Sequence, residues 1–100
     1  MELKQAAIAG TMESSDIMIT LEPQQAGSKD IEINLSSTVE KQFGDEIRRV
    51  ITETLQGMGV AGAKVKAVDK GALDCAIRAR VKTAACRAAG QTTYPWGGAK

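Results

Sequence analysis

AIAGTMESSDIMITLE, residues 7–22, is the stretch that decides the fold of the N-terminal third of the chain. A polar break divides this stretch in two. Every second residue is apolar or small on both sides of the break: Ile8, Gly10 and Met12 before it, and Ile17, Ile19 and Leu21 after it. A period of two is typical of strands with one buried face, so the stretch predicts two strands joined by a turn. Ser14 and Ser15 lie in the break, and we expect them at the exposed tip of this hairpin.

The polar residues of the break have an ordinary structural explanation. The side-chain oxygens of Ser and Asp bond the amides of their own turn, so Ser14, Ser15 and Asp16 could occur there without any further role. Glu13 and Asp16 flank the serines, but a carboxylate at an exposed turn is not a general base tuned toward neutrality. The chain contains no histidine, which excludes a Ser-His relay. We therefore predict no catalytic residue.

The rest of the chain predicts four more elements. These are a strand at 31–35, a helix at 39–58, a strand at 64–67 and a helix at 73–90. Ser37 and Glu40 have the spacing of a capping box, which favours a helix start between them. The order strand, strand, strand, helix, strand, helix indicates an α+β fold, with a small, largely antiparallel sheet and two helices packed on one of its faces.

Length and composition limit the domain organisation. With 100 residues, of which 43% are hydrophobic, residues 1–90 are expected to form a single domain with one modest core. Residues 91–100 are polar and glycine-rich apart from Tyr94-Pro95-Trp96, and they predict a flexible C-terminal tail. Trp96 is expected to fold back onto the domain, and the alternative is that it anchors a partner.

Charge and apolar patterning exclude several classes of partner. A net charge of +1 gives no reason to expect nucleic acid, whose binding needs a strongly basic surface. The chain shows neither a basic-then-apolar leader nor an apolar run of about 20 residues, the length that spans a bilayer. We therefore expect a cytoplasmic protein that does not contact a membrane. Cys75 and Cys86 have no histidine or Cys-x-x-Cys partner, which predicts reduced packing thiols and no metal site.

Positive charge is concentrated in the last predicted helix. Residues 74–87 contain Arg78, Arg80, Lys82 and Arg87 against Asp74 alone. A solvated helix face explains this excess without a function. If it has a role, docking to an acidic partner subunit or to an anionic arm is the natural candidate.

Three blocks of the sequence resemble one protein family in order and spacing. They are Ala9-Gly10-Thr11-x-Glu13-Ser14-x-Asp16, Ser37-x-Val39-x-Lys41-Gln42-Phe43-Gly44-Asp45, and Asp69-Lys70-Gly71-Ala72-Leu73-Asp74-Cys75 with Ala79-Arg80. The family is the acyl carrier protein (gamma) subunit of citrate lyase. The resemblance extends from about residue 9 to Pro95-Trp96, which is nearly the whole chain.

The resemblance implies a covalent attachment site. In that family a prosthetic group of the phosphoribosyl-dephospho-coenzyme A type is joined through a phosphodiester to the serine after the glutamate, which is Ser14 here. The neighbouring Ser15 is the less favoured position. The resemblance also implies a non-catalytic carrier that presents acetyl and citryl thioesters to the alpha (transferase) and beta (lyase) subunits, and an enzyme that attaches the group. Glu13 and Asp16 would serve recognition by that enzyme or stabilise the turn.

Two further hypotheses remain beside the carrier. The chain could be an unmodified protein-protein interaction or assembly domain that binds a partner through its sheet edge or its basic last helix. A hydrolase using Ser14 or Ser15 is disfavoured, because no base accompanies either serine.

Overall fold

The computed structural model describes residues 3–24, 30–37, 40–60 and 62–90, apart from the side chains of residues 40–42. Its elements are β1 (Ala7–Ala9), β2 (Ile17–Pro23), β3 (Ile31–Ser37), α1 (Glu40–Gly57), β4 (Ala63–Asp69) and α2 (Asp74–Ala88). The predicted tail at 91–100, with Trp96, lies outside the described residues. Within the described part, no helix is both long and apolar enough to cross a membrane.

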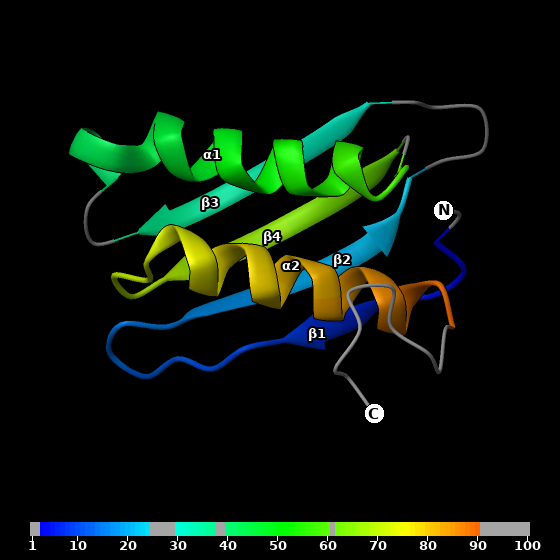
Figure 1. Cartoon of the computed structure of the whole chain (residues 1–100), viewed down its shortest axis with the longest axis horizontal. Coiled ribbons are helices and arrows are strands. Elements are labelled where there is room, and N and C mark those ends of the chain that lie inside the picture. Colours follow the sequence, from blue (N-terminus) through cyan, green and yellow to red (C-terminus); the bar gives the residue numbers. More distant parts are fainter. Residues whose placement is uncertain (1–2, 25–29, 38–39, 61, 91–100) are drawn as a thin grey trace.

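The four strands form one mixed sheet in the order β1-β2-β4-β3 (Figure 1). The β1–β2 and β2–β4 pairs are antiparallel, whereas β3 and β4 are parallel. The parallel pair arises because α1 carries the chain back along the sheet before β4 begins, as in a β-α-β crossover. Both helices cover the same face of the sheet (Figure 1), so the α+β prediction is confirmed, with one parallel pair added to its largely antiparallel sheet.

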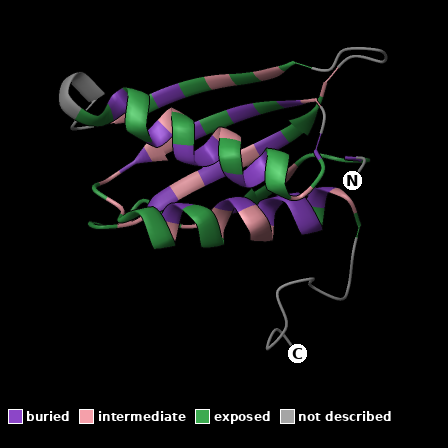
Figure 2. Ribbon diagram, turned by 45° about the horizontal axis from the view of Figure 1, so that its top comes forward, coloured by how far each residue is buried: buried purple, intermediate pink, exposed green. Residues whose placement is uncertain are grey.

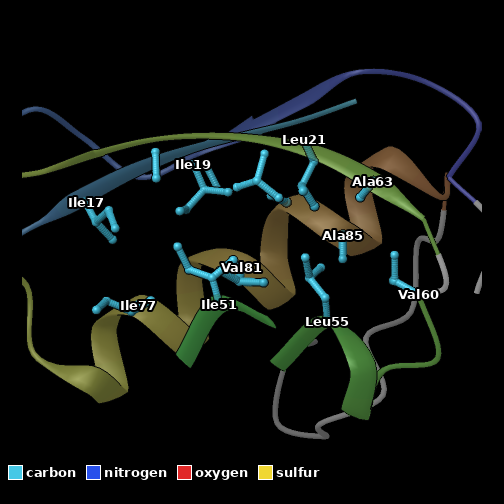
Figure 3. Close-up of a cluster of buried hydrophobic side chains, with 14 of the residues drawn as sticks. Ile17, Ile19, Leu21, Ile51, Leu55, Val60, Ala63, Ile77, Val81 and Ala85 are labelled. Carbon is cyan, nitrogen blue, oxygen red and sulfur yellow. The ribbon is translucent and has the colours of Figure 1, made fainter. Parts of the chain in front are cut away.

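The core lies between the sheet and the two helices. Along β2 the residues Ile17, Ile19 and Leu21 are fully buried, and the residues between them are not, which is the predicted alternation. In Figure 2 the buried residues of such strands appear as purple segments that alternate with pink or green ones. The buried side chains of the strands meet those of both helices in Figure 3, and the cluster includes Ile17, Ile19, Leu21, Ile51, Leu55, Ile77, Val81 and Ala85.

β1 differs from the alternation expected for it. It ends at Ala9, and Ala9 is buried while Ile8 is 54% exposed. The small residue faces inward because α2 packs closely over β1 and leaves room for alanine there. The larger apolar residue is consequently on the uncovered face.

The start of α1 also differs in part from its prediction. α1 begins at Glu40, but Ser37 is still the last residue of β3, and its hydroxyl donates to Asp69 Oδ2 at 2.9 Å. Residues 38–39 and the side chain of Glu40, on which the capping box depends, lie outside the described residues. Ser37 thus contributes to a long-range contact that its local spacing does not indicate.

The two cysteines differ in burial. Cys86 is fully buried near the end of α2. At that end the amides of Lys4 and Gln5 donate hydrogen bonds to the Ala88 carbonyl. Cys75 is exposed in the first turn of α2, so the prediction that both are packing residues is wrong for Cys75. Burial raises the pKa of the Cys86 thiol. Both thiols are free, as predicted.

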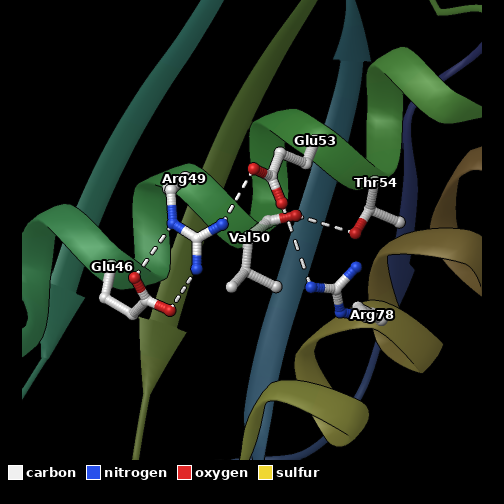
Figure 4. A network of polar contacts seen from close by, with 6 residues as sticks. All are labelled: Glu46, Arg49, Val50, Glu53, Thr54 and Arg78. Carbon is white, nitrogen blue, oxygen red and sulfur yellow. Dashed lines mark hydrogen bonds and ion pairs between the residues drawn. The ribbon is translucent and has the colours of Figure 1, made fainter.

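A network of ion pairs connects the exposed sides of the two helices (Figure 4). Arg49 binds Glu46 and, at 2.8 Å, Glu53, both on α1. Glu53 in turn lies 3.9 Å from Arg78 of α2. The hydrogen bonds with Arg49 hold the pKa of Glu46 below its usual range. Because these groups are solvated, their contribution to stability is small. The network also places Arg78 beside a carboxylate of its own domain.

Candidate functional site

The predicted hairpin tip is a tight turn with one unusual backbone position. The Asp16 amide donates to the Glu13 carbonyl at 3.2 Å, which closes a four-residue turn with Ser14 and Ser15 at its centre. Ser15 has φ 65°, the single positive value among the described non-glycine residues. A positive φ at the third position is the requirement of a type II turn. Ser14, in the second position, is exposed.

Asp16 holds this turn together. One of its carboxylate oxygens accepts the Thr11 hydroxyl at 2.6 Å and Arg80 Nη2 at 2.9 Å. The other accepts Arg80 Nε at 3.1 Å and the Ile17 amide at 2.7 Å. The Arg80 hydrogen bonds, followed by that of Thr11, hold the pKa of Asp16 well below its usual range. Asp16 is therefore an ionised structural anchor at neutral pH and a poor general base.

The Asp16–Arg80 pair predicts a pH-dependent contribution to stability. The Asp16 pKa is lower in the folded protein than in the unfolded chain, so the pair stabilises above the ordinary Asp pKa of about 4 and loses this effect as the pH falls further. Replacement of Asp16 by Asn should lower the free energy of unfolding at pH 7 by about 1 kcal/mol, a value discounted for the exposure of Arg80. Urea denaturation at several pH values measures this difference, which should shrink between about pH 5 and pH 2.

Asp45 offers the matched control for that measurement. Its carboxylate is fully exposed and lies 3.8 Å from Arg48, so Asp45→Asn should change stability little at any pH. A destabilisation by Asp16→Asn that stayed constant from neutral to acidic pH would contradict an ionic role for Asp16.

The turn is also fixed to the connection between β4 and α2. The Ser15 amide donates to the Lys70 carbonyl at 2.8 Å, and the Lys70 amide donates to the Asp16 carbonyl at 2.9 Å. These bonds continue the β2–β4 ladder beyond Ile17 and Asp69. Figure 1 shows the β1–β2 turn and the β4–α2 connection at the same end of the molecule.

Asp69 organises the other side of this connection. It is 1% exposed, and its carboxylate accepts the Ser37 hydroxyl and, at 3.0 Å, the Ala72 amide. Its strand register places it directly beside Ile17 on β2 and Ser37 on β3. Residues from all three sequence blocks, which are far apart along the chain, thus meet at one end of the fold.

The predicted site residues differ in whether they hold the turn together or are exposed to solvent. Ser14 and Glu13 are exposed. Among the described residues, neither side chain takes part in the hydrogen bonds that hold the turn. Ser15 is also exposed, but its amide and backbone conformation belong to the turn. Asp16 faces Arg80 and supplies turn stability, the second of the two roles that its position left open.

Arg80 is the site residue that the sequence did not single out. It lies 64 residues from Asp16 and comes from the basic last helix, other arginines of which also have contacts inside the domain. Arg78 approaches Glu53, and Arg87 Nη1 donates to the Ile8 carbonyl at 2.8 Å. The signals available in the sequence were the excess of arginine in this helix and the position of Arg80 in the third block.

This geometry limits the chemistry that the turn can perform. An exposed hydroxyl stands on a turn that is fixed at its base, and the nearest fixed carboxylate is ionised and already bonded. Such a site can hold a covalent group, but it cannot activate the serine as a nucleophile. These features fit a carrier domain.

Comparison with known proteins identifies the family within that class. The family described as ACP, Malonate decarboxylase delta subunit (MdcD), matches residues 4–88. The citrate lyase acyl carrier proteins of Streptococcus mutans serotype c and Streptococcus uberis are 55% and 57% identical to this chain over 96 residues, which are 96% of this chain and 92% of each relative. The chain belongs to the citrate lyase acyl carrier protein family, and its members are non-catalytic carriers.

A solved structure shares the fold. It is described as a Pseudomonas malonate decarboxylase hetero-tetramer in complex with malonate, and one of its chains aligns with a TM-score of 0.60 at 20% identity. The alignment covers 84% of this chain and 88% of that chain. The α+β arrangement described above is therefore known from an experimental structure.

Proposed function

We propose that this chain is the covalent carrier of the citrate lyase prosthetic group and that Ser14 is its anchor. The observation that supports the anchor is the exposure of Ser14 on a turn held by Asp16, Arg80 and Lys70. The turn keeps the base of an attached group in place, while the hydroxyl remains accessible to an attaching enzyme. The family membership supports the carrier role.

The residues at the turn fit a group of the phosphoribosyl-dephospho-coenzyme A type, joined to Ser14 through a phosphodiester. The exposed Ser14 oxygen leaves room for a bulky substituent, and its hydroxyl takes no part in the hydrogen bonds that hold the turn. When bound, such a group supplies a thiol that carries acyl units as thioesters. Ser15 is the poorer anchor, because its backbone is bonded to Lys70 and has the strained positive φ.

The partners that this role requires are the alpha (transferase) and beta (lyase) subunits of citrate lyase and the attaching enzyme, all in the cytoplasm. Acetyl and citryl thioesters are the cargo, which a tether presents at high effective concentration to each active site in turn. Glu13 is exposed beside Ser14 and has no part in holding the turn through its carboxylate, so we assign it to recognition by the attaching enzyme.

The alternative of an unmodified interaction domain is not favoured. That hypothesis depended in part on the positive charges of the last helix being available to a partner. Arg78 and Arg80 lie beside the carboxylates of Glu53 and Asp16 within the domain, which reduces the charge available to an acidic partner.

The mass of the intact protein tests the proposal. Protein purified from its native host should carry one covalent addition, which peptide mapping assigns to Ser14. The same chain made in a host without the attaching enzymes should have its unmodified mass and serves as the control. An unmodified mass in native protein that supports full citrate cleavage would overturn the proposed function.

A further inference from the structure

An apolar groove of about 640 Å³ lies between α1 and the start of α2. Phe43 of α1 and Leu73, just before α2, contribute large apolar side chains, and Ala72 and Ile77 continue the lining. Phe43 is 52% exposed and Leu73 is 72% exposed, although side chains of this size normally lie in a core. Exposed apolar residues that line a common hollow are typical of a binding site.

The groove lies next to the turn of residues 13–16, which is called the attachment turn below because it contains the proposed anchor Ser14. Ser15 is hydrogen-bonded to Lys70, and the next residues along the chain, Gly71 to Leu73, form one wall of the groove. A group anchored at Ser14 is therefore tethered beside this wall. A tether of that kind raises the effective concentration of its own end to millimolar values, so even weak affinity fills the groove.

The charges at the groove restrict what it can hold. Its described lining includes the acidic residues Glu46, Asp69 and Asp74 and no basic residue. Glu46 is paired with Arg49, and Asp69 is hydrogen-bonded to Ser37, whereas Asp74 is exposed in the first turn of α2. A cargo with free carboxylates is disfavoured beside these groups, while a small uncharged thioester is not.

We propose that this groove binds the distal end of the group anchored at Ser14 when that end carries an acetyl thioester, and releases it when the cargo is citryl. The proposal rests on the function proposed above, and it adds a resting place on the carrier for one of the two cargoes. Leu73 and Phe43 bury the methyl and thioester atoms, and the exposed carboxylate of Asp74 repels the free carboxylates of the citryl group.

Cys75 provides a direct probe, because it lines the groove and is exposed, whereas Cys86 is buried. Iodoacetamide alkylation of Cys75 is followed by mass spectrometry in bare, acetyl-loaded and citryl-loaded protein. Acetyl loading should slow the alkylation at least about twofold, since a millimolar effective concentration half-fills a groove of millimolar affinity. Citryl loading should give little protection, and Cys86 should react slowly in every form.

Two matched variants separate binding in the groove from simple shielding by a nearby tether. Leu73→Ser removes the most exposed apolar wall, and serine is favoured at this N-cap position, so the variant should fold. Ile8→Ser removes another exposed apolar residue, which lies on β1 and outside the groove. The ratio of loaded to bare rates should approach one for Leu73→Ser and should stay at its original value for Ile8→Ser.

The possible failures are distinguishable. If the mass of native protein shows no addition at Ser14, the proposed function fails. If the loaded protein has the addition but its Cys75 reacts as in bare protein, the groove proposal alone is overturned. Equal protection in wild type and Leu73→Ser, or equal protection by acetyl and citryl, would also overturn it.

Discussion

Ser14→Ala should abolish covalent loading and citrate cleavage while leaving the domain folded. The hydroxyl is exposed and lies outside the hydrogen bonds that hold the turn, so its removal should change the free energy of unfolding by no more than about 0.5 kcal/mol. The loss of function should be complete rather than partial, because alanine has no oxygen that could form the phosphodiester. The intact mass after co-expression with the attaching enzymes measures the loading, and urea denaturation measures the stability.

Ser15→Gly is the matched control for this experiment. Glycine adopts a positive φ without steric cost, so the backbone of the turn should be preserved at a position where Ser15 has φ 65°. This variant should still be loaded. Loading of Ser14→Ala at normal levels would move the anchor to Ser15, and unfolding of Ser14→Ala would mean that the serine has a structural role in the turn.

The long amphipathic elements could be predicted from sequence because each carries its pattern within a short window. The alternation at β2 and β4 gave the correct buried face in both strands. The same reasoning did not identify the face of β1, where a close-packed helix selects Ala9 over Ile8 for the interior. The parallel direction of β3 and β4 depends on how α1 crosses the sheet, which no local pattern contains.

The candidate site was predictable to a similar degree. The exposed hairpin tip followed from local turn chemistry, and the resemblance selected Ser14 within it. The groups that fix the tip could not be found in this way, because Arg80 reaches Asp16 from 64 residues away and Ser37 reaches Asp69 from 32 residues away. Such contacts follow from strand register and helix placement rather than from spacing along the chain. The exposure of Cys75 was missed for the same reason.

Gly10→Ala should be the most destabilising single substitution at the attachment turn. Gly10 has φ +98°, and a Cβ atom at this position would lie 1.8 Å from the carbonyl oxygen of Ile17. That oxygen belongs to the backbone of β2, so the overlap can be relieved only by moving β1 away from its partner strand. The overlap adds to the cost of a positive φ, and together they should lower the free energy of unfolding by about 3 kcal/mol or more.

Gly71→Ala is the control that separates the backbone strain from the steric part of this effect. Gly71 has φ +93°, but a Cβ atom there would meet nothing within 4 Å, so its substitution should cost only the backbone strain of about 1–2 kcal/mol. Urea denaturation of both variants beside wild type gives the difference. Because Gly10 stands where β1 leads into the turn, its replacement should also reduce loading at Ser14 at temperatures where the domain remains folded. Equal losses of stability in the two variants would show that the Ile17 carbonyl does not constrain Gly10.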